Sequence, residues 1–147
     1  MKMEGATEIL APRDRVWAAL LDPAVLSKAI PGCEELVRVG TDEYKAIMKV
    51  GVGPVKGTFD GKVRLFDLDP PTRYRMAVEG SGAPGFVRGE AAIEVAEIEG
   101  GTRVTCNADV QVGGLIASVG QRLLGGVSRM MLDQFFSRMN ELLTAPQ

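Results

Sequence analysis

The sequence contains no histidine, and this absence excludes several chemistries at once. Zinc centres combine cysteine and histidine at close spacing, but the two cysteines, Cys33 and Cys106, lie far apart and form no CxxC motif. A histidine general base is excluded for the same reason. We therefore expect neither a zinc centre nor histidine-based catalysis. Two isolated thiols are typical of a reducing compartment.

Neither sign of charge dominates, because 17 basic side chains are interspersed with 19 acidic ones. A nucleic-acid-binding surface needs a basic excess, so we expect no nucleic-acid partner. No apolar run of signal-peptide length opens the chain, and no stretch reaches the ~18 apolar residues of a membrane span. These features predict a cytoplasmic protein, and 147 residues fit a single domain, residues 1–147.

The residue patterns that are present predict an α+β fold. Residues 2–10 have the composition of a strand, and Pro12 suits the first turn of a helix. Asp22-Pro23 interrupts this helix, because a residue before proline resists helical geometry, and a second short helix is expected over residues 23–29. From Cys33 to Val112, six runs of strand composition indicate antiparallel hairpins. The turns between them lie at residues 40–42, 51–54, 69–71, 80–85 and 99–101.

A long helix is expected after Gly113-Gly114, because apolar residues then recur every three or four positions to about Leu143. It would be about 43 Å long at 1.5 Å per residue. We expect the antiparallel sheet of seven strands to curve around this helix. Gly120, Gly125 and Gly126 lie inside the predicted helix and each weakens it by about 1 kcal/mol relative to alanine. They indicate either a helix that bends to admit a ligand or close backbone packing.

Alternation in four strands places small residues on the inward face of the sheet. Polar side chains mark the outward positions, and the inward positions include Gly61, Gly89, Ala91, Cys106 and Ala108. These side chains are too short to reach a helix whose axis lies about 10 Å away. Either the helix approaches closely or a gap remains, and an empty gap costs about 24 cal/mol per Å³. We therefore predict an apolar ligand-binding cavity between the sheet and the helix.

The predicted lining combines inward strand positions with apolar helix positions. These residues are Phe59, Val63, Tyr74, Met76, Val78, Phe86, Gly89, Ala91, Cys106, Ala108, Leu123, Val127, Met130 and Met131. We predict no catalytic residue and no metal ligand among them.

Other candidate motifs have simpler explanations. Residues 80–85 match GxGxxG, but a strand follows them, so no helix N-terminus would face a phosphate and we predict a hairpin loop at the cavity rim. Asp60 and Glu90 could form an acid/base pair, yet alternation places both on the solvated face. Cys106 points inward without a histidine to activate it, so we interpret it as a small core residue.

Several strings in the chain match one family pattern. The most specific are IPGCE at residues 30–34 and VGVGPVKGTFDG at residues 50–61. Further matches lie at residues 11–17, 22–23, 42–44, 69–71, 85–86, 100–103 and 133–136. Together they resemble CoxG, a family of carbon monoxide dehydrogenase subunits within the START-like (SRPBCC) superfamily. The resemblance implies the helix-grip fold, also called the START or Bet v 1-like fold.

The resemblance also implies a function. CoxG proteins are accessory to molybdenum-containing carbon monoxide dehydrogenase-type oxidoreductases, and are associated with membrane recruitment of the enzyme and with carrying a quinone. The resemblance implies a non-catalytic subunit that binds neither molybdenum nor an iron–sulfur cluster and has no covalently bound cofactor. Some members continue into a membrane-interacting segment, whereas this sequence stops at Gln147. We therefore expect transient, peripheral contact with the inner face of the cell membrane.

Two alternatives remain open at this point. One is a START-like enzyme that acts on an apolar small molecule, which would need inward polar groups. The other is a pure docking subunit without a ligand. The oligomeric state is also left open, with a homodimer as one option.

Overall fold

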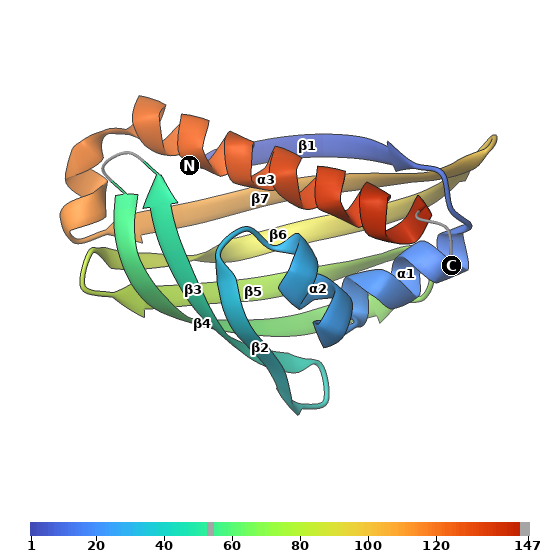
Figure 1. The fold of residues 1–147 in the computed structure, drawn as a ribbon, viewed down its shortest axis with the longest axis horizontal. Helices are drawn as coiled ribbons and strands as arrows, with labels where there is room; N and C mark the ends of the chain where they lie inside the picture. Colours follow the sequence, from blue (N-terminus) through green and yellow to red (C-terminus); the bar gives the residue numbers. More distant parts are fainter. Residues whose placement is uncertain (53–54, 145–147) are drawn as a thin grey trace.

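The computed structural model describes residues 1–52 and 55–144, and it has the predicted α+β architecture (Figure 1). One antiparallel sheet contains all seven strands in the order β1-β7-β6-β5-β4-β3-β2. The strands are β1 (Lys2–Ile9), β2 (Cys33–Gly40), β3 (Glu43–Val52), β4 (Val55–Asp69), β5 (Arg73–Gly82), β6 (Gly85–Ile98) and β7 (Gly101–Gly113). The predicted turn at residues 51–54 includes Gly53 and Pro54, which lie outside the described residues.

Two short helices follow β1, as predicted from the proline positions. Helix α1 spans Arg13–Leu21 and helix α2 spans Pro23–Ala29. Asp22 separates them, and its side-chain Oδ1 accepts a hydrogen bond from the backbone N–H of Ala24 at 2.9 Å. This is an N-terminal cap that starts α2 where Pro23 occupies the first helical position.

The C-terminal segment differs from the prediction, because it is two helices. A 3₁₀ helix, η1, spans Leu115–Val119, and the long helix α3 spans Gln121–Thr144. Gly120 lies at the break with φ of 99°, a conformation that other residues rarely adopt. Gly120 is therefore a junction and not an interior helix position. The α3 helix of 24 residues is about 36 Å long at 1.5 Å per residue, shorter than predicted.

Helix α3 lies closest to strand β1 at one edge of the sheet. A Cβ atom at Gly5 would lie only 2.5 Å from Cδ2 of Leu132, so the missing side chain of Gly5 permits this approach. Helices α1 and α2 lie over the same face of the sheet, at one end of its strands, as Figure 1 shows. This arrangement leaves part of the inner face over β3, β4 and β5 without a closely packed helix.

The buried side chains form two separate clusters on the inner face. The larger one joins both short helices, the second half of α3 and the adjoining parts of the strands, and it contains Val16, Val104 and Met139 at 0–1% exposure. The smaller one contains Val55, Phe59 and Ile116, with Leu124 and Val127 of α3 packed against it. The molecule therefore has one densely packed end and one lightly packed end.

Candidate ligand-binding site on the inner face

Three small residues on neighbouring strands form a row across the inner face, here called the small-residue row. Ala46 of β3 pairs with Gly61 of β4, which pairs with Gly80 of β5. All three are partly exposed, although alternation places them on the same face as the buried Tyr44, Phe59 and Tyr74. The row lies between the residues of the larger cluster and those of the smaller one.

The space above the small-residue row is open. A Cβ atom added at Gly80 would meet no heavy atom within 4 Å. The three atoms nearest to a Cβ at Gly61 all belong to the sheet, namely two carbonyl oxygens and the Cβ of Ala46. Of the five small inward residues on which the cavity prediction rests, Gly61 belongs to this row, whereas Ala91 and Cys106 are buried in the larger cluster and Ala108 packs against it.

The first half of α3 contains two glycines without close neighbours, of which Gly126 is exposed on the same side of the helix as Leu123 and Met130. Cβ atoms at Gly125 and Gly126 would each meet nothing within 4 Å outside the local helix backbone. Close backbone packing therefore does not explain these two glycines. Each lowers the stability of the helix by about 1 kcal/mol relative to alanine, which makes this half of α3 easier to deform.

Two hollows that stand out among the described residues lie on the opposite, outer face of the sheet. One has a volume of about 590 Å³ and is lined by outward side chains such as Lys45, Lys62 and Glu79, with the backbone of Gly61 and Gly80 in its floor. The other, of about 380 Å³, lies beside Arg73 and Glu94. Neither of these hollows lies on the inner face, where the observed openness is limited to the small-residue row.

Most of the residues predicted to line the cavity lie on the inner face or on α3, but they are divided between the larger and the smaller cluster. Four are buried on the inner face: Phe59, Tyr74, Ala91 and Cys106. Seven are partly buried on the inner face or on α3: Val63, Met76, Val78, Gly89, Ala108, Val127 and Met131. Whether any of them binds a ligand stays a prediction.

Three of the predicted lining residues lie elsewhere. Phe86 is 41% exposed and belongs to the outer face, where the guanidinium of Arg88 lies 5.7 Å from its ring centroid. The prediction that Phe86 faces inward is wrong, because its strand parity is that of Arg88. Leu123 and Met130 are 46% and 36% exposed, since they lie two turns apart on the side of α3 away from both clusters.

Ala46, Gly80 and Leu124 lie on the inner side but are not among the predicted lining residues. Strand β3 carries no clear alternation, so the sequence assigns no face to Ala46. The sequence predicts a loop from Gly80 onward, whereas β5 continues to Gly82. Extending the alternation of β5 beyond Val78 would have placed Gly80 on the inner face. Leu124 packs against the smaller cluster in place of the neighbouring Leu123.

The densely packed end places three hydroxyls inside: that of Thr102, which donates to the carbonyl of Ala11 at 2.7 Å, and those of two tyrosines. The hydroxyl of Tyr44 donates to the carbonyl of Leu21 at 2.6 Å and accepts from Nη2 of Arg38 at 3.0 Å. Tyr74 is 4% exposed, its ring meets that of Trp17 edge-on at 5.4 Å, and its hydroxyl has no hydrogen-bond partner within the described residues. Burial raises the pKa of Tyr74, so this hydroxyl stays protonated at neutral pH.

Cys106 behaves as the predicted small core residue. It is 6% exposed, and burial raises the pKa of its thiol. A raised pKa keeps the less reactive thiol form at neutral pH. The inner face thus has no activated nucleophile at this position.

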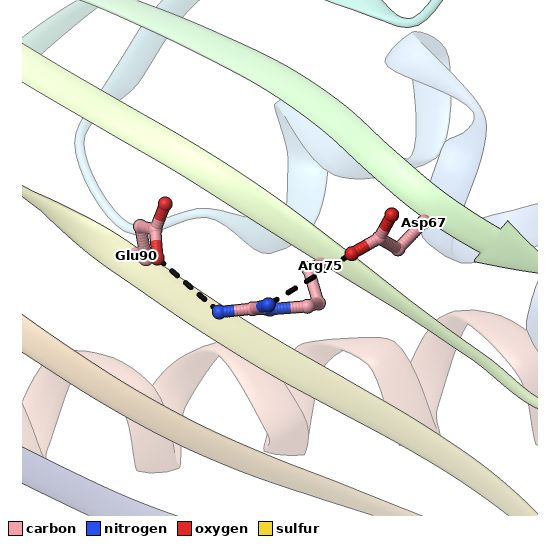
Figure 2. A network of polar contacts seen from close by, with 3 residues as sticks. All are labelled: Asp67, Arg75 and Glu90. Atoms are coloured by element: carbon pink, nitrogen blue, oxygen red, sulfur yellow. Dashed lines mark hydrogen bonds and ion pairs between the residues drawn. The ribbon is translucent and has the colours of Figure 1, made fainter.

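The carboxylates considered as an acid/base pair lie on the outer face, as predicted. Figure 2 shows Glu90 in an ion pair with Arg75, whose guanidinium also approaches Asp67. The distances are 3.3 Å from Nη2 of Arg75 to Glu90 and 3.8 Å from Nη1 to Asp67, and all three side chains are at least half exposed. Asp60 is also exposed. This is a solvated surface network, and surface pairs of this kind contribute little to stability.

Within residues 1–52 and 55–144, no group of three or more cysteine, aspartate or glutamate side chains could hold a metal ion. None of the helices in this part of the chain is both long and apolar enough to span a membrane.

Several solved structures have the same fold as this chain. A conserved protein from Geobacillus kaustophilus is 37% identical, with 97% of this chain and 95% of that chain covered and a TM-score of 0.93. Protein Ms6760 from Mycobacterium smegmatis is 20% identical over 98% and 91% of the two chains, with a TM-score of 0.75. Ara h 8.0201 is 14% identical over 99% of each chain, with a TM-score of 0.70. The chain therefore has the Bet v 1-like helix-grip fold.

The assignment of the chain to a family comes from its sequence. The family model of CoxG, a subunit of carbon monoxide dehydrogenase, matches residues 5–144, so the chain belongs to the CoxG family. The family name associates its members with carbon monoxide dehydrogenase. A search of curated proteins found no match.

Proposed function

We propose that this protein is a non-catalytic accessory subunit of a carbon monoxide dehydrogenase-type molybdenum oxidoreductase, and that it carries an apolar ligand between its sheet and α3. The proposed ligand class is a quinone, and the proposed role is to link the enzyme to the membrane. Membership of the CoxG family supports the association with the enzyme.

The observation that carries the proposal is the open small-residue row. Apolar surface that stays in contact with water is unfavourable by about 25 cal/mol per Å², and an apolar ligand that covers it offsets that cost. The row lacks side chains that could fill the space, and a Cβ at Gly80 would meet nothing within 4 Å. A flat ring with an apolar tail suits such a gap, because both parts bury apolar surface.

The tyrosine hydroxyls on the inner face favour a ligand-carrying role over a catalytic role. Tyr44 uses its hydroxyl to hold Leu21 and Arg38. The hydroxyl of Tyr74 is kept neutral by its raised pKa, so it can donate a hydrogen bond but is a poor base at neutral pH.

Titration with decylubiquinone tests the proposal. We expect the purified protein to bind this probe and the substitution Gly80→Phe to weaken binding by about tenfold or more, because the new ring occupies the gap. The matched control is Ala77→Phe, three positions away on the same strand and on the opposite face, which should leave binding unchanged. Native mass spectrometry of gently purified protein should also detect a bound apolar molecule.

A second filling variant keeps the test decisive if Gly80→Phe fails to fold. Gly61→Leu enters the same gap, and its Cβ would make only ordinary contacts of 3.6–3.8 Å. No binding of decylubiquinone by the wild-type protein, or undiminished binding by a folded filling variant, would contradict the proposal. If the filled variants still support the partner enzyme fully, a docking subunit without a ligand is the better description.

A further inference from the structure

The 3₁₀ helix η1 lies between two glycines in backbone conformations that other residues rarely adopt. Gly114 precedes it with φ of 79°, and Gly120 follows it with φ of 99°. A Cβ atom at Gly120 would meet nothing within 4 Å, so the backbone conformation and not a lack of space favours glycine there. Rigid segments turn about a few residues at their ends, and glycine absorbs such changes of φ and ψ easily.

The elements on both sides of η1 are fixed by contacts of their own. Gly113, the last residue of β7, pairs with Phe86, and a Cβ atom at Gly113 would collide with the Phe86 ring. On the other side, the backbone N–H of Leu124 donates to the carbonyl of Gly120 at 3.1 Å and closes the first turn of α3. The two glycine junctions therefore bound a segment that can move without its neighbours.

One side chain and one backbone hydrogen bond attach η1 to the β5–β6 hairpin and the inner face. Ile116 is the buried residue of η1, at 3% exposure, whereas Leu115 beside it is 74% exposed. The N–H of Ile116 donates to the carbonyl of Pro84 at 2.8 Å, and within residues 1–52 and 55–144 no other backbone hydrogen bond joins η1 to the hairpin. A segment with so few buried contacts opens locally more often than the packed elements do.

Ile116 closes the lightly packed end of the inner face. It packs with Phe59 of β4 in the smaller cluster, and Phe59 is the neighbour of Gly61 on the same face of that strand. Figure 1 shows the segment between β7 and α3 at this end of the sheet. Withdrawal of Ile116 would therefore uncover Phe59 and open the side of the small-residue row that faces away from the larger cluster.

We infer that η1 is a hinged flap that turns about Gly114 and Gly120, and that Ile116 leaves the smaller cluster when an apolar molecule enters or leaves the space above the small-residue row. Helix α3 stays in place, because Leu124 and Val127 pack against the same cluster from the helix side. The loading route rests on the proposed function, whereas the motion of the flap does not depend on a ligand.

Hydrogen exchange of the ligand-free full chain, resolved by NMR, tests the motion. We expect the amide of Ile116 to exchange about tenfold or more faster than that of Val127 in the interior of α3, because η1 opens without the helix. Ile116→Ala should speed exchange throughout η1 by about a further tenfold and leave β7 and α3 unchanged. If this variant does not fold, Ile116→Val should give a smaller rise of the same kind.

The matched control for the exchange experiment is Val127→Ala. It shortens a side chain that contacts the same cluster from α3, and it should change exchange at Ile116 by less than about threefold. Equal exchange of the Ile116 and Val127 amides in the wild type, or equal effects of the two alanine substitutions on η1, would overturn the flap. In either case η1 would open only together with α3.

Stopped-flow binding of decylubiquinone tests the loading route. A flap limits passage in both directions, so Ile116→Ala should raise the association and dissociation rates about fivefold or more each and change Kd by less than about threefold. Val127→Ala should instead raise the dissociation rate and Kd, with the association rate unchanged. An unchanged association rate in Ile116→Ala would overturn the route. If the wild type binds no decylubiquinone, the proposed carriage and the route both fail, while hydrogen exchange decides the flap by itself.

Discussion

The two ends of this molecule share one sheet but differ in how that sheet is covered. At the densely packed end, α1, α2 and the second half of α3 bury Ile9, Val104 and Met139 to 0–1% exposure. At the lightly packed end, η1 and the first half of α3 leave Gly80 with no heavy atom within 4 Å of the position a Cβ would take. The dense end therefore supplies most of the hydrophobic stabilisation, and the light end is where we place the proposed ligand.

The largest expected effect is a difference in stability loss between substitutions of two methionines on α3. Met139→Ala should lower the free energy of unfolding by about 2–5 kcal/mol, because a fully buried side chain leaves a cavity behind. Met131→Ala, two turns earlier and only partly buried, should cost about 1 kcal/mol. Urea denaturation followed by the fluorescence of Trp17 measures both. Equal losses would contradict the contrast between the two ends.

A second pair of substitutions compares the contributions to stability of the two inward tyrosine hydroxyls of the dense end. Tyr44→Phe removes two hydrogen bonds and should cost about 1–2 kcal/mol. Tyr74→Phe removes a hydroxyl without a partner in the described chain, so its stability should change by less than about 0.5 kcal/mol. The same denaturation experiment applies. A large loss from Tyr74→Phe would indicate an unrecognised partner for that hydroxyl.

The smallest expected effect is a gain in stability at the light end. Gly126→Ala should stabilise the protein by about 0.5–1 kcal/mol, because the helix interior favours alanine and the new methyl group meets no atom within 4 Å. Gly120→Ala is the matched control and should destabilise instead, because φ at this junction is 99°. Thermal unfolding followed by circular dichroism distinguishes the two signs, and a destabilising Gly126→Ala would show that this stretch of α3 is not a regular helix.

Much of the fold could be predicted because local rules specify it. The Asp22-Pro23 break, the strand alternation around Phe59 and Tyr74, and the outward positions of Asp60 and Glu90 depend only on neighbouring residues. Leu123 could not be assigned in this way, because it competes with Leu124 for the inner side of α3. Phe86 could have been, because alternation from Arg88 places it on the outer face.

The break at Gly120 shows why periodicity alone was insufficient for the C-terminal segment. Apolar residues recur at three and four positions on both sides of it, so the pattern fits one continuous helix. The backbone instead turns at Gly120, and η1 packs on the β5–β6 hairpin through Ile116 and Pro84. This contact joins segments that are more than thirty residues apart, and no local rule contains it.

By itself, the sequence determined the order of the elements, the faces of four strands and membership of the CoxG family, because each of these depends on short-range patterns or on matching strings. Tertiary structure decided which small residues stay uncovered. Gly5 and Gly80 are both inward glycines, yet the first lies under Leu132 and the second beneath open space. The difference comes from the path of α3 along β1, which long-range packing sets.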